Sequence, residues 1–446
     1  MRAVALGVAL FCAVSLLIPV VASAHAVLLK TTPASSQSLA AAPAQVQLLF
    51  SEPLDPVFSH VQVRDASGQL VDAGDSRVDP DDDRLLVASL QPGLPNGVFT
   101  VQWRSLSAID VHPDEGQYAL FVGVPVQASS VPVTASAPST ATPATTLGRW
   151  WFYVAASLFG GVLATWKLVL APLLAQAGAR PAAHASARRL MHRLIVVGGV
   201  LLILGTLFSA VAQAAAAANV PLVDGLGSPL GELLLRGRFA SIWWPRLGLE
   251  VASLLLIVFG GIEGLASECA LATLPAVLLT SALTSHGAAL PNAAGAGIAI
   301  DWLHIVGACA WVGGLMALVA FLPLVRRDSD SGITLRQLVG RFGRLALVAA
   351  SVVLLSGVVQ GALELGSLSG LTTTLYGQLL LVKAALLAVM LALAGLHEWR
   401  VRSSRPLSLG RLGGLSSGIG IELTLGILVF AVAALLSSTP PTTPTS

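Results

Sequence analysis

Two short stretches of this 446-residue chain carry side chains that could hold a metal ion together. One is Asp110-Val111-His112-Pro113, and the other is the histidine at position 25. In an extended backbone residues i and i+2 point to the same side, and a proline biases the residue before it toward that conformation. The carboxylate of Asp110 and the imidazole of His112 are therefore expected to project together. A terminal His25 would add its α-amine and its ring Nδ1, and three nitrogens with one oxygen suit Cu(II) in tetragonal geometry.

A cleavable leader is expected before His25. Arg2 is followed by an apolar run over residues 4–18 and by the small residues Ala22, Ser23 and Ala24. This arrangement is typical of a signal peptide, here residues 1–24, that is cut directly before His25. The alternative is an uncleaved membrane anchor. Cleavage would make His25 the mature amino terminus and expose the amine that the metal site requires.

Residues 25–126 show the alternation expected of half-buried β-strands. Val46, Leu48 and Phe50 alternate with their neighbours, and residues 99–104 and 118–122 repeat the pattern between turn signals. About seven short strands in a region of this length predict an extracytoplasmic all-β sandwich of the Greek-key, cupredoxin or immunoglobulin-like type. The region contains no cysteine, so no disulfide stabilises it and its hydrophobic core must do so alone.

The rest of the chain has the composition of a membrane protein. Only 11% of all residues are charged, against roughly 25% in ordinary globular domains. Residues 127–148 are rich in Ser, Thr, Pro and Ala and predict a linker. Beyond it, residues 149–437 are expected to form an all-α polytopic membrane bundle of eight transmembrane helices, followed by a tail over residues 438–446. The eight apolar segments lie at approximately 150–175, 192–218, 246–264, 269–287, 299–323, 342–363, 376–396 and 418–437.

The arginines between these segments predict the orientation of the bundle. If the β domain lies outside, the loops after the odd-numbered segments face the cytoplasm. Those loops hold thirteen arginines and the opposite side holds three, Arg236, Arg238 and Arg246, in agreement with the positive-inside rule. Both the N-terminal domain and the C-terminus are therefore expected on the extracytoplasmic side. His397 is expected on the cytoplasmic side, as a loop residue or a contact with lipid headgroups. The thirteen are Arg180, Arg188, Arg189, Arg193, Arg326, Arg327, Arg336, Arg341, Arg344, Arg400, Arg402, Arg405 and Arg411.

Five ionisable residues of the apolar segments are candidates for moving an ion through the membrane, because such residues are costly there. His286 closes the fourth segment and His304 opens the fifth, so the two rings are expected to approach each other at the outer face. Asp301 lies one turn before His304 and is expected to fix the tautomer of that ring. Glu364 and Lys383 lie in the outer halves of later segments. The alternative for each residue is an anchor at the membrane interface.

The two regions resemble two known families that handle copper. Residues 25–126 resemble the periplasmic copper-binding protein CopC, and residues 150–437 resemble the membrane protein CopD, so the chain looks like a natural fusion of the two. The CopC resemblance implies that His25, Asp110 and His112 bind Cu(II) and that Glu52 orients a ligand or the amine. It is carried by His25 to Pro33, Phe50-Ser51-Glu52-Pro53, Trp103-Arg104, Asp110-Val111-His112-Pro113 and Gly116. The CopD resemblance is carried by Ser285-His286-Gly287, Asp301-Trp302-Leu303-His304 and Trp311-Val312-Gly313-Gly314.

The chain departs from some CopC proteins in one respect. No methionine occurs between Met1 and Met191, so the β domain lacks the soft thioether ligands of a Cu(I) site. His60 cannot build such a site alone and is expected to be a strand residue. The domain is therefore expected to bind Cu(II) only.

These observations predict a copper-binding protein of the bacterial cytoplasmic membrane and not an enzyme. It would capture Cu(II) outside and pass it to the bundle for import, with copper, membrane lipid and periplasmic copper carriers as partners. The chain has no basic patch for nucleic acid and no GK[ST] motif for nucleotide. One alternative is a copper-dependent redox enzyme, against which Asp110 argues because it fills the position that oxygen would need. The other is a copper sensor or storage module without transport.

Overall fold

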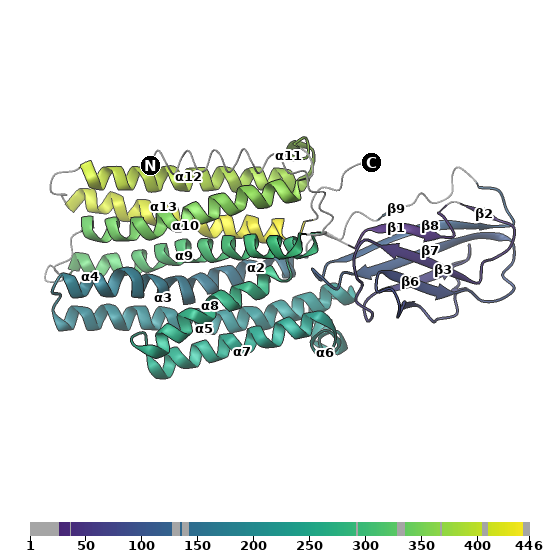
Figure 1. Ribbon diagram of the computed structural model, residues 1–446, viewed down its shortest axis with the longest axis horizontal. Coiled ribbons are helices and arrows are strands. Elements are labelled where there is room, and N and C mark those ends of the chain that lie inside the picture. The colour runs from purple at the N-terminus through teal and green to yellow at the C-terminus, as the bar shows by residue number, and fades with distance from the viewer. Residues whose placement is uncertain are drawn as a thin grey trace.

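The chain forms a β-sheet domain and a long helical bundle, which lie end to end (Figure 1). The computed structural model describes residues 26–35, 37–126, 134–135, 142–290, 293–327, 335–365, 368–403 and 409–439. The expected leader, His25, most of the expected linker and nearly all of the C-terminal tail lie outside the described residues.

The strands of the β domain form two sheets. Their bounds are β1 Leu28–Thr32, β2 Ser38–Leu39, β3 Gln45–Phe50, β4 His60–Arg64, β5 Arg77–Val78, β6 Leu85–Ser89, β7 Gly97–Leu106, β8 Pro113–Val122 and β9 Thr134–Ala135. One sheet has the strand order β1-β3-β6-β5, and the other has the order β2-β8-β7-β4 with β9 paired to β8. His60 is the first residue of β4, as expected of a strand residue.

The inward residues of the two sheets form a single core, which confirms the sandwich. The alternating residues Val46, Leu48 and Phe50 of β3 are fully buried, and they share this core with Trp103 of β7 and Tyr118 of β8. Phe50 and Trp103 meet edge to face with ring centroids 5.2 Å apart. Aromatic and aliphatic side chains from both sheets therefore hold a domain that has no disulfide.

Eight helices of the described part are long and apolar enough to cross a membrane, as expected. The first is one continuous run of α2 Pro143–Ala156, η1 Ser157–Gly161, α3 Val162–Thr165, η2 Trp166–Leu170 and α4 Ala171–Gln176. The others are α5 Pro181–Ala218, α7 Gly237–Gly260, α8 Leu265–Ala282, α9 Ala294–Arg327, α10 Leu335–Glu364, α12 Leu375–Ser403 and α13 Leu409–Leu436. Short helical pieces lie between them: η3 Asp224–Leu226, α6 Ser228–Leu235, η4 His286–Ala289 and α11 Gly370–Thr373.

Two details differ from the expectations. The first helix starts at Pro143, inside the range expected to be linker, because Thr142 caps it by accepting a hydrogen bond from the Thr145 amide. His397 is not a loop residue. It is buried between α12 and α13, where its Nδ1 forms a hydrogen bond with Glu422, and the carboxylate supplies the partner that a buried imidazole requires.

Glycines allow the first helix and α9 to touch along their backbones. A Cβ atom built on Gly313 would lie 2.2 Å from the carbonyl oxygen of Ser157, and one on Gly161 would lie 2.3 Å from that of Cys309. Such close approach by small residues is a common way for membrane helices to associate. The contact places α9, which carries several of the candidate residues, at a fixed depth against the first helix.

Gly313→Leu is expected to lower the thermal stability of the purified protein strongly, by about 3 kcal/mol, since the side chain would have to push two backbones apart. Gly248→Leu in α7 is the matched control, because a Cβ atom there meets nothing within 4 Å. Thermal denaturation in detergent measures both. Equal stability of the two variants would contradict the close packing of the first helix and α9.

The bundle holds the loop between β7 and β8 by its backbone. Arg238 in α7 donates from Nη1 to the carbonyl oxygen of Ile109 at 2.6 Å, and Gln213 in α5 donates from Nε2 to that of Val111 at 2.5 Å. Figure 1 shows the sheets lying against this end of the bundle. Two carbonyl groups of the loop, two residues apart, are therefore held by side chains of two different helices.

A side chain of the β domain also donates hydrogen bonds to the backbone of the bundle. Arg104 of β7 donates to the carbonyl oxygens of Ala216 and Ala217 at the end of α5, at 2.7 Å and 3.3 Å. Apolar side chains from both parts fill the space beneath it: Phe58, Leu106 and Val111 of the β domain with Ala214, Ala217 and Leu233 of the bundle. Hydrogen bonds and a small apolar core thus hold the two domains in one arrangement.

Candidate metal centre

The Asp110-Val111-His112 motif lies in the loop between β7 and β8, and it is not extended as the sequence suggested. Val111 has a φ of 60°, a left-handed conformation that is strained for a β-branched residue. The surrounding contacts impose it. The amide of Ser107 donates to the carbonyl oxygen of His112 at 3.0 Å, and the amide of Val111 donates back to that of Ser107 at 3.1 Å. The expected convergence of the two side chains is present, but a tight turn produces it.

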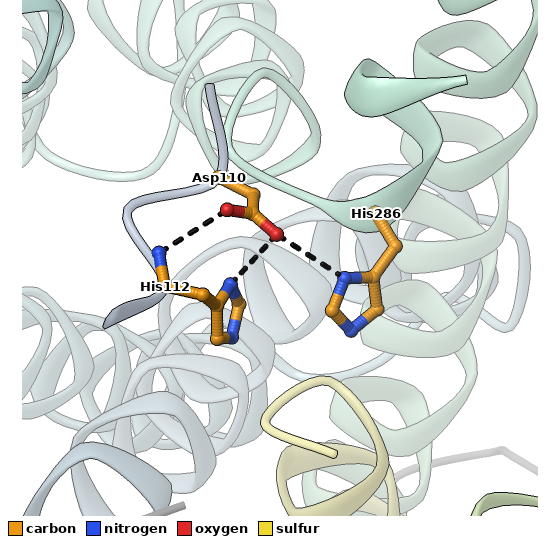
Figure 2. Close-up of side chains that lie close together, drawn as sticks. All are labelled: Asp110, His112 and His286. Carbon is orange, nitrogen blue, oxygen red and sulfur yellow. Dashed lines mark hydrogen bonds and ion pairs between the residues drawn. The ribbon is translucent and has the colours of Figure 1, made fainter. Parts of the chain in front are cut away.

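Asp110 and His112 meet a third potential ligand from the bundle. Oδ2 of Asp110 lies 2.9 Å from Nδ1 of His112 and 3.6 Å from Nδ1 of His286. One ligand atom from each of the three residues lies within 4.8 Å of the others, and all three residues are buried. Figure 2 shows the carboxylate lying between the two imidazoles. We call Asp110, His112 and His286 the shared cluster.

The two rings of the shared cluster are stacked, with centroids 5.1 Å apart and planes 30° apart. Burial lowers the pKa of His112, with Arg149 and His286 acting in the same direction and Asp110 opposing them. His112 is therefore a neutral imidazole at neutral pH, the form that binds metal. Two imidazole nitrogens and a carboxylate oxygen form a donor set that fits Cu(II).

Glu52 lies at the edge of this cluster. Its Oε2 accepts a hydrogen bond of 2.6 Å from the Ser107 hydroxyl, and its Oε1 has no hydrogen-bond partner among the described residues. Burial, together with the nearby Asp110 carboxylate, raises the pKa of Glu52 to about 8, although the Ser107 hydrogen bond opposes this. Among the described residues, the groups that act on this carboxyl are the Asp110 carboxylate and the Ser107 hydroxyl, and neither is positively charged.

The chain that follows His25 is fixed next to Glu52. The amide of Val27 donates to the hydroxyl of Ser51 at 2.9 Å, and the amide of Ser51 donates to the carbonyl oxygen of Val27 at 2.9 Å. His25 itself lies outside the described residues, so its role as a ligand stays a prediction. The resemblance that assigned Glu52 to orient a ligand or the amine stays a prediction as well.

The contacts seen for His286 and His304 are with different groups, not with each other as expected. His286 is not at the end of a membrane helix. It begins the short helix η4 after α8, and this turn directs its ring to the β domain. His304 lies within α9, where its Nδ1 is 3.0 Å from the hydroxyl of Ser356 in α10. We expected the two rings to approach each other because consecutive helices usually pack side by side. That packing does not determine the direction in which a ring at the end of a helix points.

Asp301 does not hold the ring of His304, contrary to expectation. Its Oδ1 accepts a hydrogen bond of 3.1 Å from Nε2 of Gln360, and the same amide donates to Oε1 of Glu364 at 3.3 Å. Lys383 interacts electrostatically with both carboxylates. The structure therefore links Asp301 and Glu364 through Gln360 and places Lys383 along the same cavity, and it assigns the contact with His304 to Ser356.

One cavity of about 630 Å³ joins the shared cluster to these residues. His286 and Arg149 line it next to the β domain, and Asp301, His304 and Lys383 line it inside the bundle. The helices that border it are the first helix and α8, α9, α10, α12 and α13. All five residues that the sequence proposed for transfer, Glu364 included, thus border one continuous space, although they do not form one cluster.

Arg149 and Arg238 were not recognised from the sequence as part of the site. Arg149 contacts Nε2 of His112 at 3.4 Å and donates to Oγ of Ser438 at 2.7 Å, so it lies between the shared cluster and the end of α13. Arg238 holds the loop before Asp110. A signal was present, because Arg238 is one of the three arginines between segments on the side that the positive-inside rule disfavours, and Arg149 directly precedes the first segment on that side.

The fold and the site define a class: a multi-pass membrane protein with a β-sandwich docked on one end and a cluster of potential metal ligands shared between the two parts. Residues 28–123 match the model of the CopC domain family, and residues 336–436 match that of copper resistance protein D.

Several known proteins are similar to the chain. Copper transport protein CutJ of Bacillus subtilis is 30% identical over 428 residues, which are 95% of this chain and 75% of that protein. Copper resistance protein D of Pseudomonas syringae pv. tomato is 28% identical, over 48% of this chain and 72% of that one. The crystal structure of CopC from Methylosinus trichosporium OB3b is 32% identical, covering 22% of this chain and 93% of that one, with a TM-score of 0.20. The chain therefore belongs to the CopC–CopD family of copper resistance and transport proteins.

Proposed function

We propose that the β domain captures Cu(II) outside the cytoplasmic membrane and passes it to the bundle for import. The observation that carries this function is the shared cluster, in which Asp110 of the β domain lies 2.9 Å from His112 of the same domain and 3.6 Å from His286 of the bundle. A metal held by ligands of both domains can change partners one bond at a time. Such exchange avoids the high cost of a bare cation in a medium of low dielectric constant.

Three further observations support the proposal. The cavity behind His286 continues into the bundle toward Asp301 and Lys383, which gives the ion a route. The excess of arginine in the loops at the far end of the bundle favours placing the β domain outside. The ligands of the shared cluster are nitrogen and oxygen atoms, which favour Cu(II) over Cu(I). His25 and Glu52 would complete the site after cleavage of the leader.

Copper accumulation tests this function. Cells that express the full chain are expected to accumulate more copper than cells without it, and Asp110→Ala combined with His112→Ala is expected to remove the difference at matched expression. Purified protein in sealed vesicles should likewise admit Cu(II). Bound Cu(II) without any uptake would instead identify a storage or sensing module, and turnover of a reductant by the copper-loaded protein would identify an enzyme.

A further inference from the structure

Arg149, near the start of the first membrane helix, lies where three cavities meet. It lines the cavity of about 630 Å³ inside the bundle and two smaller cavities, of about 170 and 80 Å³, at the junction with the β domain. His112 borders the first of the smaller cavities, and Asp110 borders the second. Of the described residues, Arg149 alone lines all three. Its side chain therefore lies between the surroundings of the shared cluster and the inside of the bundle.

The guanidinium of Arg149 has uncharged hydrogen-bond partners. Nη1 donates to the hydroxyl of Ser438 at 2.7 Å and to the carbonyl oxygen of Ser437, directly after α13. Nη2 contacts Nε2 of His112 at 3.4 Å. The Asp110 carboxylate acts on the guanidinium electrostatically. A full positive charge thus lies beside a cluster whose ligands suit a cation, and in a medium of low dielectric constant it opposes the binding of a second cation.

The contact with Arg149 determines which nitrogen of His112 carries a proton. A guanidinium has donors only, so Nε2 of His112 accepts, and the single proton of the neutral ring sits on Nδ1. Nδ1 is also the nitrogen that faces the Asp110 carboxylate, at 2.9 Å, with His286 on the other side of that carboxylate (Figure 2). In the empty cluster the nitrogen that faces the other ligands is therefore protonated, and Arg149 holds the opposite nitrogen.

Copper bound at Nδ1 of His112 would reverse this arrangement. The metal replaces the proton on Nδ1, and the ring stays neutral when a proton from water binds Nε2 in exchange. That N–H group then faces a guanidinium that also only donates, so the hydrogen bond with Arg149 is lost. The charge of the ion repels the guanidinium as well. Both effects oppose loading of the cluster, and both favour the return of Arg149 to His112 when the ion leaves.

We propose that Arg149 promotes the release of Cu(II) from the shared cluster into the bundle, because it stabilises the empty cluster and repels the bound ion. The inference rests on the proposed function in taking Cu(II) as the ion and the bundle as its destination. Arg149 is not a ligand; it sets how firmly the ligands hold the ion. Leu436 and Ser437 line the large cavity, so a movement of Arg149 away from His112 also acts on a helix end that borders this space.

Replacing Arg149 by methionine removes the charge and the donor and keeps a long side chain. This variant is expected to bind Cu(II) at least about ten-fold more tightly than the wild type, mostly through slower dissociation. Titration of the purified full-length chain against a competing chelator gives the affinity, and transfer of bound copper to excess chelator gives the dissociation rate. A residue with a purely structural role would give the opposite result, because its loss would loosen the cluster and weaken binding.

Three further variants make the test decisive. Arg149→Gln keeps a donor without the charge and is expected to tighten binding as well, whereas Arg149→Lys keeps both and should bind like the wild type. Arg236→Met is the matched control, since it removes a positive charge from the same side of the bundle, where Arg236 is exposed and pairs with Glu232 at 3.4 Å. Unchanged or weaker binding in the methionine and glutamine variants, or equal tightening by lysine, would overturn the proposal.

Copper uptake separates this inference from the proposed function. If cells with the wild-type chain accumulate no additional copper, the proposed function fails, while the affinities of the purified variants still test Arg149. If the wild type imports copper, cells with Arg149→Met should import it more slowly at matched expression, because the ion leaves the shared cluster more slowly. Import at the wild-type rate by a variant that binds more tightly would show that release into the bundle does not depend on Arg149.

Discussion

Replacing His286 by alanine is expected to reduce copper uptake by at least about ten-fold while the β domain still binds Cu(II), because a metal ligand lost from a site commonly costs one to two orders of magnitude. His286 is the bundle residue whose ring stacks on His112 and whose Nδ1 lies 3.6 Å from Asp110. Without it the shared cluster keeps only its two ligands from the β domain among the described residues. Copper content of cells, measured at matched expression, gives the result.

The control for this variant is His184→Ala. The ring of His184 contacts that of Trp166, at the end of the bundle away from the β domain. It should leave uptake unchanged. If cells with His286→Ala take up copper as well as the wild type does, the ion must bypass the shared cluster, and the cavity would have to be reached from elsewhere.

Replacing His112 by alanine is expected to weaken Cu(II) binding at the shared cluster by about 100-fold or more, since it removes one ligand outright. Asp110→Ala is expected to have at least as large an effect, because its carboxylate lies against both imidazoles. Titration of the purified full-length chain against a competing chelator measures the affinity. The leader must be removed correctly, so that His25 can contribute its amine.

His60→Ala provides the comparison within the same domain. His60 begins β4 and pairs with Arg104 on the neighbouring strand, so it lies outside the shared cluster. It should bind Cu(II) like the wild type. A loss at His60 as large as that at His112 would mean that the principal ligands have been misidentified.

The sequence predicted the parts of the fold that depend on local pattern. Alternation such as that of Val46, Leu48 and Phe50 marked the strands, and the length of apolar runs marked the eight crossings. Asp110 and His112 could be found because their spacing, a weak signal alone, gains weight from the histidine expected at the mature amino terminus. The strands and the membrane crossings depend on residues that are neighbours in the sequence, so they can be predicted without knowledge of the partner domain.

Tertiary contacts account for what the sequence did not predict. The left-handed Val111 is unfavourable by local preference and exists because Ser107 and Gln213 hold the backbone around it. Likewise, His286 faces His112 because a short helix turns it there, which spacing along the chain cannot show. A side chain in a loop between two helices can point to either domain, and only the docked structure decides which.

Because the contacts that dock the β domain bind carbonyl oxygens of the main chain, mutation of the side chains around them should be tolerated during evolution. Arg238 and Gln213 bind the backbone of Ile109 and Val111, and Arg104 binds that of the residues at the end of α5. Every residue offers a main-chain carbonyl oxygen, whatever its side chain. Homologous chains could therefore diverge along this interface while the arginines and the loop geometry persist. Covariation between aligned positions would give little sign of the interface, even where it is fully preserved.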